Sequence, residues 1–306
     1  MKFWILIFIS ISLLAQTPEG SAKKAYLANI NTLLVFTSES GLSSGHYRFT
    51  KSDFKMQSYS LPFRHHFKPL DSKMNWFANG GVGYSITRLD TQTRVSRSGT
   101  DIDLRHDNKL QTYTAGLGGG LRYKSEMGVD FSGGMGLIYS RVGTSVKPED
   151  DIGDAIKDFF DSQYNDNITY KLFISAEYKK EIEGFKPYGK IDLKSYETKA
   201  DFTFDVLAGF TTQSDVATFS VGSETPSLMK YEENYLSLEG YIKFNYLHGD
   251  ITDVVRFKKY INMGVLAYWN TPDFPSWARR FYAEVSTVRA EGLEGYNIAM
   301  GFSLEL

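Results

Sequence analysis

Cysteine is absent from the 306 residues of this chain, and proline is scarce, with eight residues. The lack of cysteine excludes disulfide frameworks, thiolate zinc sites and cysteine nucleophiles. An excess of either charge is also missing, because 34 Lys and Arg residues stand against 36 Asp and Glu residues. A net charge of −2 and a pI near 6.2 therefore give no reason to expect nucleic acid as a partner, since phosphates favour a basic surface.

Long apolar runs are lacking as well, apart from the one at the N-terminus. No later segment has the roughly 20 apolar residues of a transmembrane helix, and the mean hydropathy is −0.30. What the chain does contain is glycine and aromatic residues, with 27 Gly, 22 Phe and 20 Tyr. These residue types are poor or middling helix formers, and Phe and Tyr are enriched in strands. The composition therefore indicates an all-β protein.

The N-terminal segment has the features of a secretory signal peptide. Lys2 precedes an apolar run at 3–14, which is shorter than a membrane-spanning helix, and small residues lead up to Ala22. We predict a signal peptide over 1–22, with cleavage after Ala15 as the alternative. Because no cysteine follows the apolar run, a lipoprotein anchor is excluded. The mature chain is expected to cross the inner membrane.

Apolar and polar residues alternate along most of the remaining chain. The alternation is visible at 112–123, 127–140, 168–179, 236–246 and 296–306. A period of two places large apolar side chains on one face of a strand and small or polar ones on the other. In a soluble β-protein the apolar face would cover a core, whereas in a membrane barrel it faces lipid. These runs fit the about 9–11 residues that span a bilayer better than the about 5–6 of a globular strand.

We predict a transmembrane antiparallel β-barrel of about 12 strands over 23–306, an even number that closes the sheet with both termini in the periplasm. The predicted strands are 26–39, 45–63, 74–90, 108–124, 126–144, 166–181, 184–198, 201–221, 233–247, 257–270, 278–289 and 295–306, with the eighth interrupted around 211–215. The outer connections are then 40–44, 91–107, 145–165, 199–200, 248–256 and 290–294. The longest connections, 91–107 and 145–165, fall outside, as is usual in such barrels.

Tryptophan placement and lumen charge follow from this topology. Trp76, Trp269 and Trp277 lie at strand ends on the periplasmic rim, where indole favours the membrane interface. The alternation assigns nine charged residues to the lumen: Lys171, Glu177, Lys179, Lys190, Asp192, Lys194, Glu239, Lys243 and Glu284. Such charges either line a weakly selective pore or pair across the lumen and fill it. The sequence is compatible with both.

Few residues point to chemistry. The glycines at 116–120 lie inside an alternating strand, which favours a curved or roomy wall over a phosphate-binding loop. His46, His106 and His248 are expected near the outer rim. His248 and Asp250 have the spacing of a carboxylate-oriented base, but a hydrated outer loop is the preferred interpretation. No metal-binding spacing is present, and we expect no cofactor, no catalytic site and no metal site.

The segment 147–166 is acidic and carries apolar residues at helical spacing. We predict a short amphipathic helix in this outer loop. Its acidic face is expected to be solvated; binding of divalent cations held by lipopolysaccharide is the alternative, although the spacing is not that of an EF-hand loop.

The last third of the chain resembles the translocator barrel of autotransporters. The resemblance rests on SWARRFYAEVSTVRAEGLEGYNIAMGFSLEL at 276–306, where a penultimate strand and a short loop lead to an alternating final strand. It is similar in particular to the solitary barrels that lack a passenger domain. The resemblance implies that Tyr296, Met300, Phe302, Leu304 and Leu306 form the signal read by the barrel-assembly machinery. The chain departs from the pattern by ending on Leu306, where Phe is more common.

The sequence thus predicts an outer-membrane barrel in a Gram-negative envelope that acts as a small pore or as a structural surface protein. An outer-membrane enzyme of the lipase or protease type, with residues at the outer rim, is the alternative. The expected partners are outer-membrane lipid, lipopolysaccharide and the barrel-assembly machinery, and the oligomeric state stays open. Because little precedes the first predicted strand, we expect no exported passenger.

Overall fold

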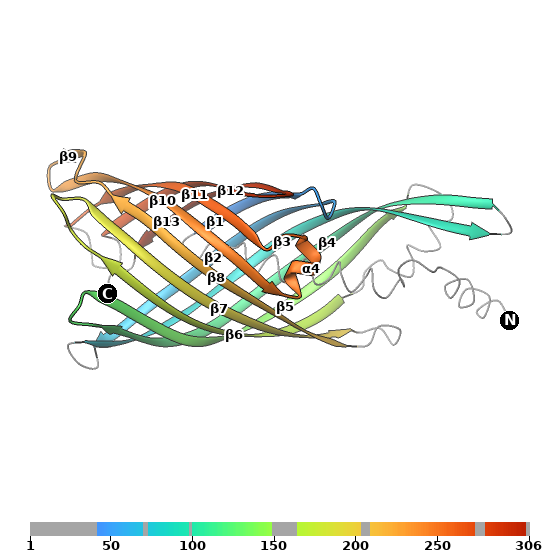
Figure 1. The fold of residues 1–306 in the computed structure, drawn as a ribbon, viewed down its shortest axis with the longest axis horizontal. Coiled ribbons are helices and arrows are strands. Elements are labelled where there is room, and N and C mark those ends of the chain that lie inside the picture. The colour runs from blue at the N-terminus through green and yellow to red at the C-terminus, as the bar shows by residue number, and fades with distance from the viewer. Residues whose placement is uncertain are drawn as a thin grey trace.

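A computed structural model describes residues 42–69, 73–97, 100–148, 164–202, 209–272 and 279–303. They form one antiparallel sheet of 13 strands, of which all but the three-residue β9 make up the barrel wall (Figure 1). The strands are β1 (Leu42–Phe49), β2 (Phe54–Pro69), β3 (Met74–Arg97), β4 (Thr100–Lys124), β5 (Val129–Pro148), β6 (Tyr164–Lys179), β7 (Lys186–Phe202), β8 (Phe210–Glu224), β9 (Met229–Tyr231), β10 (Asn234–Gly249), β11 (Lys259–Asn270), β12 (Arg280–Ala290) and β13 (Leu293–Ser303).

The sheet is closed. Each wall strand pairs with its neighbours in the chain, and β1 pairs antiparallel with β13, from Leu42 opposite Met300 to Phe49 opposite Leu293. Closure leaves no sheet edge whose backbone groups would be unpaired in lipid. The predicted all-β transmembrane barrel of about 12 strands is therefore confirmed. We call the end that carries the turn 50–53 the outer end and the end that carries 125–128 the inner end.

The two faces of the wall differ as the alternation requires. Outward side chains are large and apolar, and Leu117, Met135 and Leu172 are 70%, 67% and 59% exposed. Inward side chains between them are small or polar, and Thr112 and Ser140 are fully buried. The apolar outward residues and the polar inward residues offset each other in the mean hydropathy. The outer surface is therefore suited to lipid although the mean is negative. Within the described residues, no helix is long and apolar enough to span a membrane.

We expect a charge on the outward face to destabilise the barrel according to its depth. Leu117 lies at the centre of the outward apolar row of β4, whereas Met127 is 76% exposed in the turn at the inner end. Leu117→Arg should cost about 2–4 kcal/mol of folding free energy, and Met127→Arg about 0–1 kcal/mol. Urea titration of the barrel folded into lipid vesicles measures both. Equal costs at the two positions would contradict a lipid-facing belt.

The prediction for the second strand is wrong, although the number of wall strands is right. The predicted strand 26–39 lies outside the described residues, and the predicted strand 45–63 is divided between β1 and β2 by the turn 50–53. This turn contains neither glycine nor proline, and Asp53 itself adopts a left-handed φ of 50°. It therefore lacks the two strongest signals of a reversal in a sequence, glycine and proline. Residues 42–44, predicted as an outer loop, begin β1 at the inner end.

Two outer connections and the predicted interruption of the eighth strand also differ from the structure. The segment 91–107 is mostly strand, because β3 and β4 continue beyond the wall as a two-stranded ribbon (Figure 1). Residues 199–200 belong to β7, and β8 runs without interruption through 211–215, each residue paired with β7. The predicted interruption is therefore wrong: both faces of β8 are polar near its outer end, and Thr212 and Ser214 are turned inward and buried.

The short helix of the described chain lies in a different outer loop from the one predicted. It is α4 (Ile251–Val255), in the loop between β10 and β11. Residues 149–163, the centre of the segment predicted as helical, lie outside the described residues, and the ends of that segment belong to β5 and β6.

Candidate functional site

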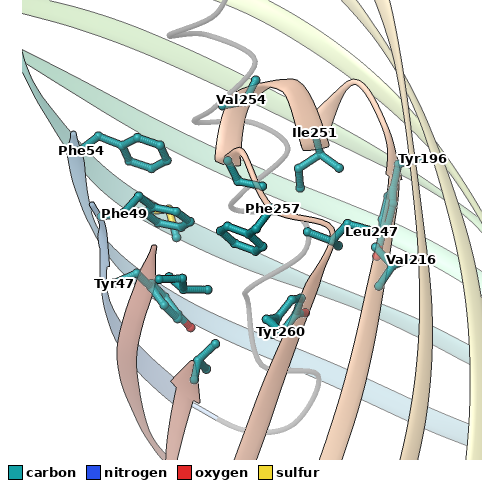
Figure 2. Close-up of a cluster of buried hydrophobic side chains, with 14 residues drawn as sticks. Tyr47, Phe49, Phe54, Tyr196, Val216, Leu247, Ile251, Val254, Phe257 and Tyr260 are labelled. Carbon is teal, nitrogen blue, oxygen red and sulfur yellow. The ribbon is translucent and has the colours of Figure 1, made fainter. Parts of the chain in front are cut away.

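The outer end of the lumen contains a cluster of buried apolar side chains, which we call the outer plug. Its members are Tyr47, Phe49, Phe54, Met56, Tyr196, Val216, Leu247, Ile251, Val254, Val255, Phe257, Tyr260, Val288 and Leu293. They come from eight wall strands and from the α4 loop, and Figure 2 shows Ile251 and Phe257 between Phe49 on one side and Leu247 on the other. Apolar side chains on lumen-facing positions exclude water at this level.

Hydrogen bonds hold the α4 loop in place. The Asp250 carboxylate accepts a hydrogen bond from the Gln213 backbone N–H at 2.8 Å. The Ser52 hydroxyl donates to the Val254 carbonyl at 2.6 Å, and Arg256 Nη1 donates to the Lys51 carbonyl at 2.9 Å. The loop is thereby tied to β8 on one side and to the β1–β2 turn on the other.

The inner half of the lumen is polar, and carboxylates dominate the wall formed by β8 and β10–β12. Glu239 accepts hydrogen bonds from the hydroxyls of Tyr188 and Tyr268, at 2.8 and 2.9 Å. Glu284 accepts one from Tyr241 at 2.5 Å. Tyrosine hydroxyls thus stabilise carboxylates that the sequence places on lumen-facing positions.

A buried ion pair joins this wall at the inner end. Glu224 is 2% exposed, and Arg280 Nη2 lies 2.8 Å from its Oε2 at an angle outside hydrogen-bond geometry. Ser237 donates a hydrogen bond to Oε1 at 2.8 Å, and Lys186 Nζ lies 3.9 Å from the same atom. Arg280 also stacks on Tyr268, with its Cζ atom 3.5 Å from the ring centroid.

The facing wall, β2 to β7, contains a cavity of about 130 Å³ in the inner half of the lumen. Among the nine charged residues that the alternation assigned to the lumen, the structure places five around it: Lys171, Glu177, Lys190, Asp192 and Lys194. Glu239, Lys243 and Glu284 lie instead on the carboxylate wall, where Lys243 Nζ is 4.5 Å from the Tyr241 ring centroid. Lys179 is exposed at the inner end of β6.

A row of four residues in register forms the floor of this cavity. Phe77 of β3 pairs with Gly120, Gly120 pairs with Gly134, and Gly134 pairs with Phe173 of β6. The two phenylalanine rings lie over the glycine pair, with ring centroids 6.0 Å apart. Glycine is required here because a Cβ on either residue would contact the ring above it within 2.9 Å. Gly120 therefore makes room for an aromatic ring, in agreement with the interpretation of the glycines at 116–120 as part of a barrel wall.

Several lumen residues were not singled out from the sequence. Arg64, Arg122 and Asp130 line the cavity, and Tyr188 and Tyr268 hold Glu239. Their parity along each strand is the signal that could have found them.

The histidine predictions fare differently. His46 lies in the middle of β1, with its ring stacked on outward-facing Tyr296 at 4.9 Å, so its placement at the outer rim is wrong. His248 lies at the outer end of β10, but the Asp250 carboxylate bonds to the Gln213 backbone, so no carboxylate-oriented base is formed by that pair. The side chain of His106 is outside the described part. Among the described residues, no group of His, Asp or Glu side chains is arranged to hold a metal ion.

Of the remaining predicted residues, Trp76 and Trp269 lie near the inner end of the barrel, on β3 and β11, and Trp277 is outside the described residues. Tyr296, Met300 and Phe302 share the outward face of β13 and are about half exposed. Leu304 and Leu306 lie outside the described residues. Their role as an assembly signal stays a prediction.

No protein-family model matches this chain, and no curated protein sequence matches it. Its structure is similar to the translocator domain of the autotransporter NalP from Neisseria meningitidis, with a TM-score of 0.59 and 11% identity over 94% of this chain and 99% of that domain. It is similar to the beta domain of the Bordetella autotransporter BrkA, with a TM-score of 0.55 and 7% identity over 87% and 100%. The transport unit of the autotransporter AIDA-I from Escherichia coli matches with a TM-score of 0.51 and 10% identity over 94% and 99%. The chain therefore has the fold of an autotransporter-like outer-membrane β-barrel.

Proposed function

We propose that this protein is an integral outer-membrane barrel that acts as a small gated pore, closed at its outer end in the described conformation. One observation supports this function above the others: a charged, partly open lumen in the inner half ends at an apolar plug built around α4. If the lumen side chains served only to stabilise the barrel, we would expect them to fill the lumen and to leave no cavity lined by charged groups. The part of the plug that the α4 loop contributes, Ile251, Val254, Val255 and Phe257, can by contrast be displaced without disrupting the wall strands.

Location in the outer membrane is part of this proposal. It is supported by the closed wall, the outward apolar belt and the fold shared with autotransporter translocators. Export by the signal peptide, the interaction with lipopolysaccharide and the barrel-assembly machinery, and the lack of a passenger stay predictions. Heat-modifiable migration on SDS gels, together with detergent-dependent extraction from outer-membrane fractions, tests the location.

Planar-bilayer conductance tests the gated pore. We expect the wild-type barrel to be closed most of the time, with brief openings. Ile251→Ala combined with Phe257→Ala removes two apolar side chains of the α4 loop from the plug, at a cost of several kcal/mol to the closed arrangement. The open fraction should rise at least tenfold.

The matched control removes the same two residue types from the lipid face. Ile261→Ala combined with Phe244→Ala alters side chains that are 39% and 46% exposed on the outward surface, and should leave gating unchanged. If neither the wild type nor the plug variant conducts although both are heat-modifiable, the pore is refuted, and the structural surface protein becomes the better account. If the control opens as readily as the plug variant, the gate is not the plug.

A further inference from the structure

The cavity in the inner half of the lumen carries more positive than negative charge. Five cationic side chains line it: Arg64, Arg122, Lys171, Lys190 and Lys194. Three carboxylates do so as well: Asp130, Glu177 and Asp192. The lining therefore has a formal charge of +2 when His66 is neutral. We call this cavity the basic vestibule.

The three carboxylates lie next to two of the five cations. Arg122 forms an ion pair with Asp130, and Lys190 Nζ lies 2.9 Å from Asp192 Oδ1. Glu177 is the cross-strand partner of Lys190 in the β6–β7 register. The three carboxylates of the vestibule thus neutralise mainly the positive charges of Arg122 and Lys190.

Arg64 and Lys171 are placed over aromatic rings. Arg64 Cζ is 5.1 Å from the Phe77 ring centroid, and Lys171 Nζ is 5.5 and 5.8 Å from those of Phe173 and Tyr196. A ring face stabilises a cation through its quadrupole but carries no net charge. The positive charge of both side chains therefore remains available to an anion in the cavity.

The wall behind these cations contains a pair of glycines. Gly118 pairs with Gly136 in the row that joins Asn79 to Lys171, next to the row with the two phenylalanines. A Cβ atom on Gly118 would lie 2.7 Å from Oδ1 of Asn79, so this glycine leaves room for the Asn79 side chain, which lines the cavity. His66, another lining residue, has a buried Nδ1 atom without a hydrogen-bond partner within the described part of the chain. The vestibule thus combines surplus positive charge with an unused polar atom.

We propose that the basic vestibule binds a small multivalent anion of the phosphate or carboxylate type. Guanidinium and ammonium groups bind these anions through charge-assisted hydrogen bonds, and a concave wall with surplus positive charge raises the local concentration of anions. A volume of about 130 Å³ limits the ligand to a small molecule. The role of such an anion as the transported substrate rests on the proposed function, whereas its binding does not require the pore to open.

Binding is tested with inorganic phosphate and pyrophosphate, titrated calorimetrically into the purified full-length barrel in detergent at low salt. We expect saturable binding that is tighter for pyrophosphate and weakens as salt is raised. Arg64→Gln combined with Lys171→Gln should weaken binding at least tenfold. If that pair does not yield a heat-modifiable barrel, the single variant Lys171→Gln, expected to weaken binding several-fold, replaces it.

The matched control removes one arginine and one lysine from other places, with Arg48→Gln on β1 and Lys243→Gln on the carboxylate wall. It should keep binding within about twofold, because both changes lie outside the vestibule. Lack of saturable binding by the wild type, or equal weakening by the control, would overturn the proposal. A barrel that binds pyrophosphate but never conducts would refute the pore and leave the vestibule standing; a barrel that conducts without binding would do the opposite.

Discussion

Gly120→Val is expected to abolish the folded, heat-modifiable form of this barrel. A Cβ atom at this position would lie 2.3 Å from the Gly133 carbonyl oxygen and 2.8 Å from Cζ of Phe77. The first of these atoms belongs to the backbone of the neighbouring strand and cannot move without breaking the β4–β5 ladder. Overpacking of a side chain alone costs about 1–3 kcal/mol, and a clash with paired backbone should exceed that range.

The sign of this prediction opposes strand propensity. Valine is a better strand former than glycine, so a strand without a steric constraint would be stabilised by the substitution. Gly189→Ala supplies the control, because a Cβ there meets nothing within 4 Å. It should refold into vesicles as well as the wild type or better. Normal heat-modifiable migration of Gly120→Val would show that β4 and β5 do not approach each other as described.

Arg280→Met is expected to destabilise the barrel by about 3–5 kcal/mol, because it leaves a buried carboxylate without its main counter-charge. Glu224 is 2% exposed, and the second cation near it, Lys186, is farther away at 3.9 Å. The Ser237 hydroxyl alone cannot balance the charge. The midpoint of urea unfolding in lipid vesicles measures the loss.

Two further variants separate the ion pair from side-chain packing. Lys186→Met should cost less than about 1 kcal/mol, since its side chain is 35% exposed and its contact is long. Glu224→Gln added to Arg280→Met should restore part of the lost stability, because it removes the uncompensated charge. If the double variant is as unstable as Arg280→Met alone, the loss comes from the stacking of Arg280 on Tyr268.

Much of the wall could be predicted from local pattern. Period-two alternation depends only on residues within one strand, and so the strands from β3 to β6 and from β10 to β13 were located to within a few residues, apart from the extended ribbon of β3 and β4. The alternation gives no signal where a segment does not have one face on the apolar belt and the other in the lumen. The polar outer end of β8 extends beyond the apolar belt, and the turn 50–53 reverses the chain with ordinary polar residues.

The candidate sites depend on contacts between strands, which cannot be predicted from the sequence of any one strand. Phe77 and Phe173 meet only because the registers of β3 to β6 place them at the two ends of one row. The outer plug brings together residues as distant in sequence as Phe49 and Leu293, which are neighbours only once the barrel closes. Lumen-facing positions could thus be proposed from parity, whereas their partners required the closed sheet.

The ribbon of β3 and β4 has a practical consequence. Beyond Asp90 and Asp107 these two strands continue to pair up to Arg97 and Thr100, while β5 pairs with β4 only as far as His106. The six pairs from Gln92 to Arg97 lie beyond the last β4–β5 pair and correspond to a reach of about 20 Å at the rise of an extended strand. An epitope or reporter inserted between 97 and 100 would lengthen a hairpin that already stands clear of the wall and would leave barrel closure untouched. In the orientation that we propose for the barrel in the outer membrane, the ribbon offers a labelling site on intact cells.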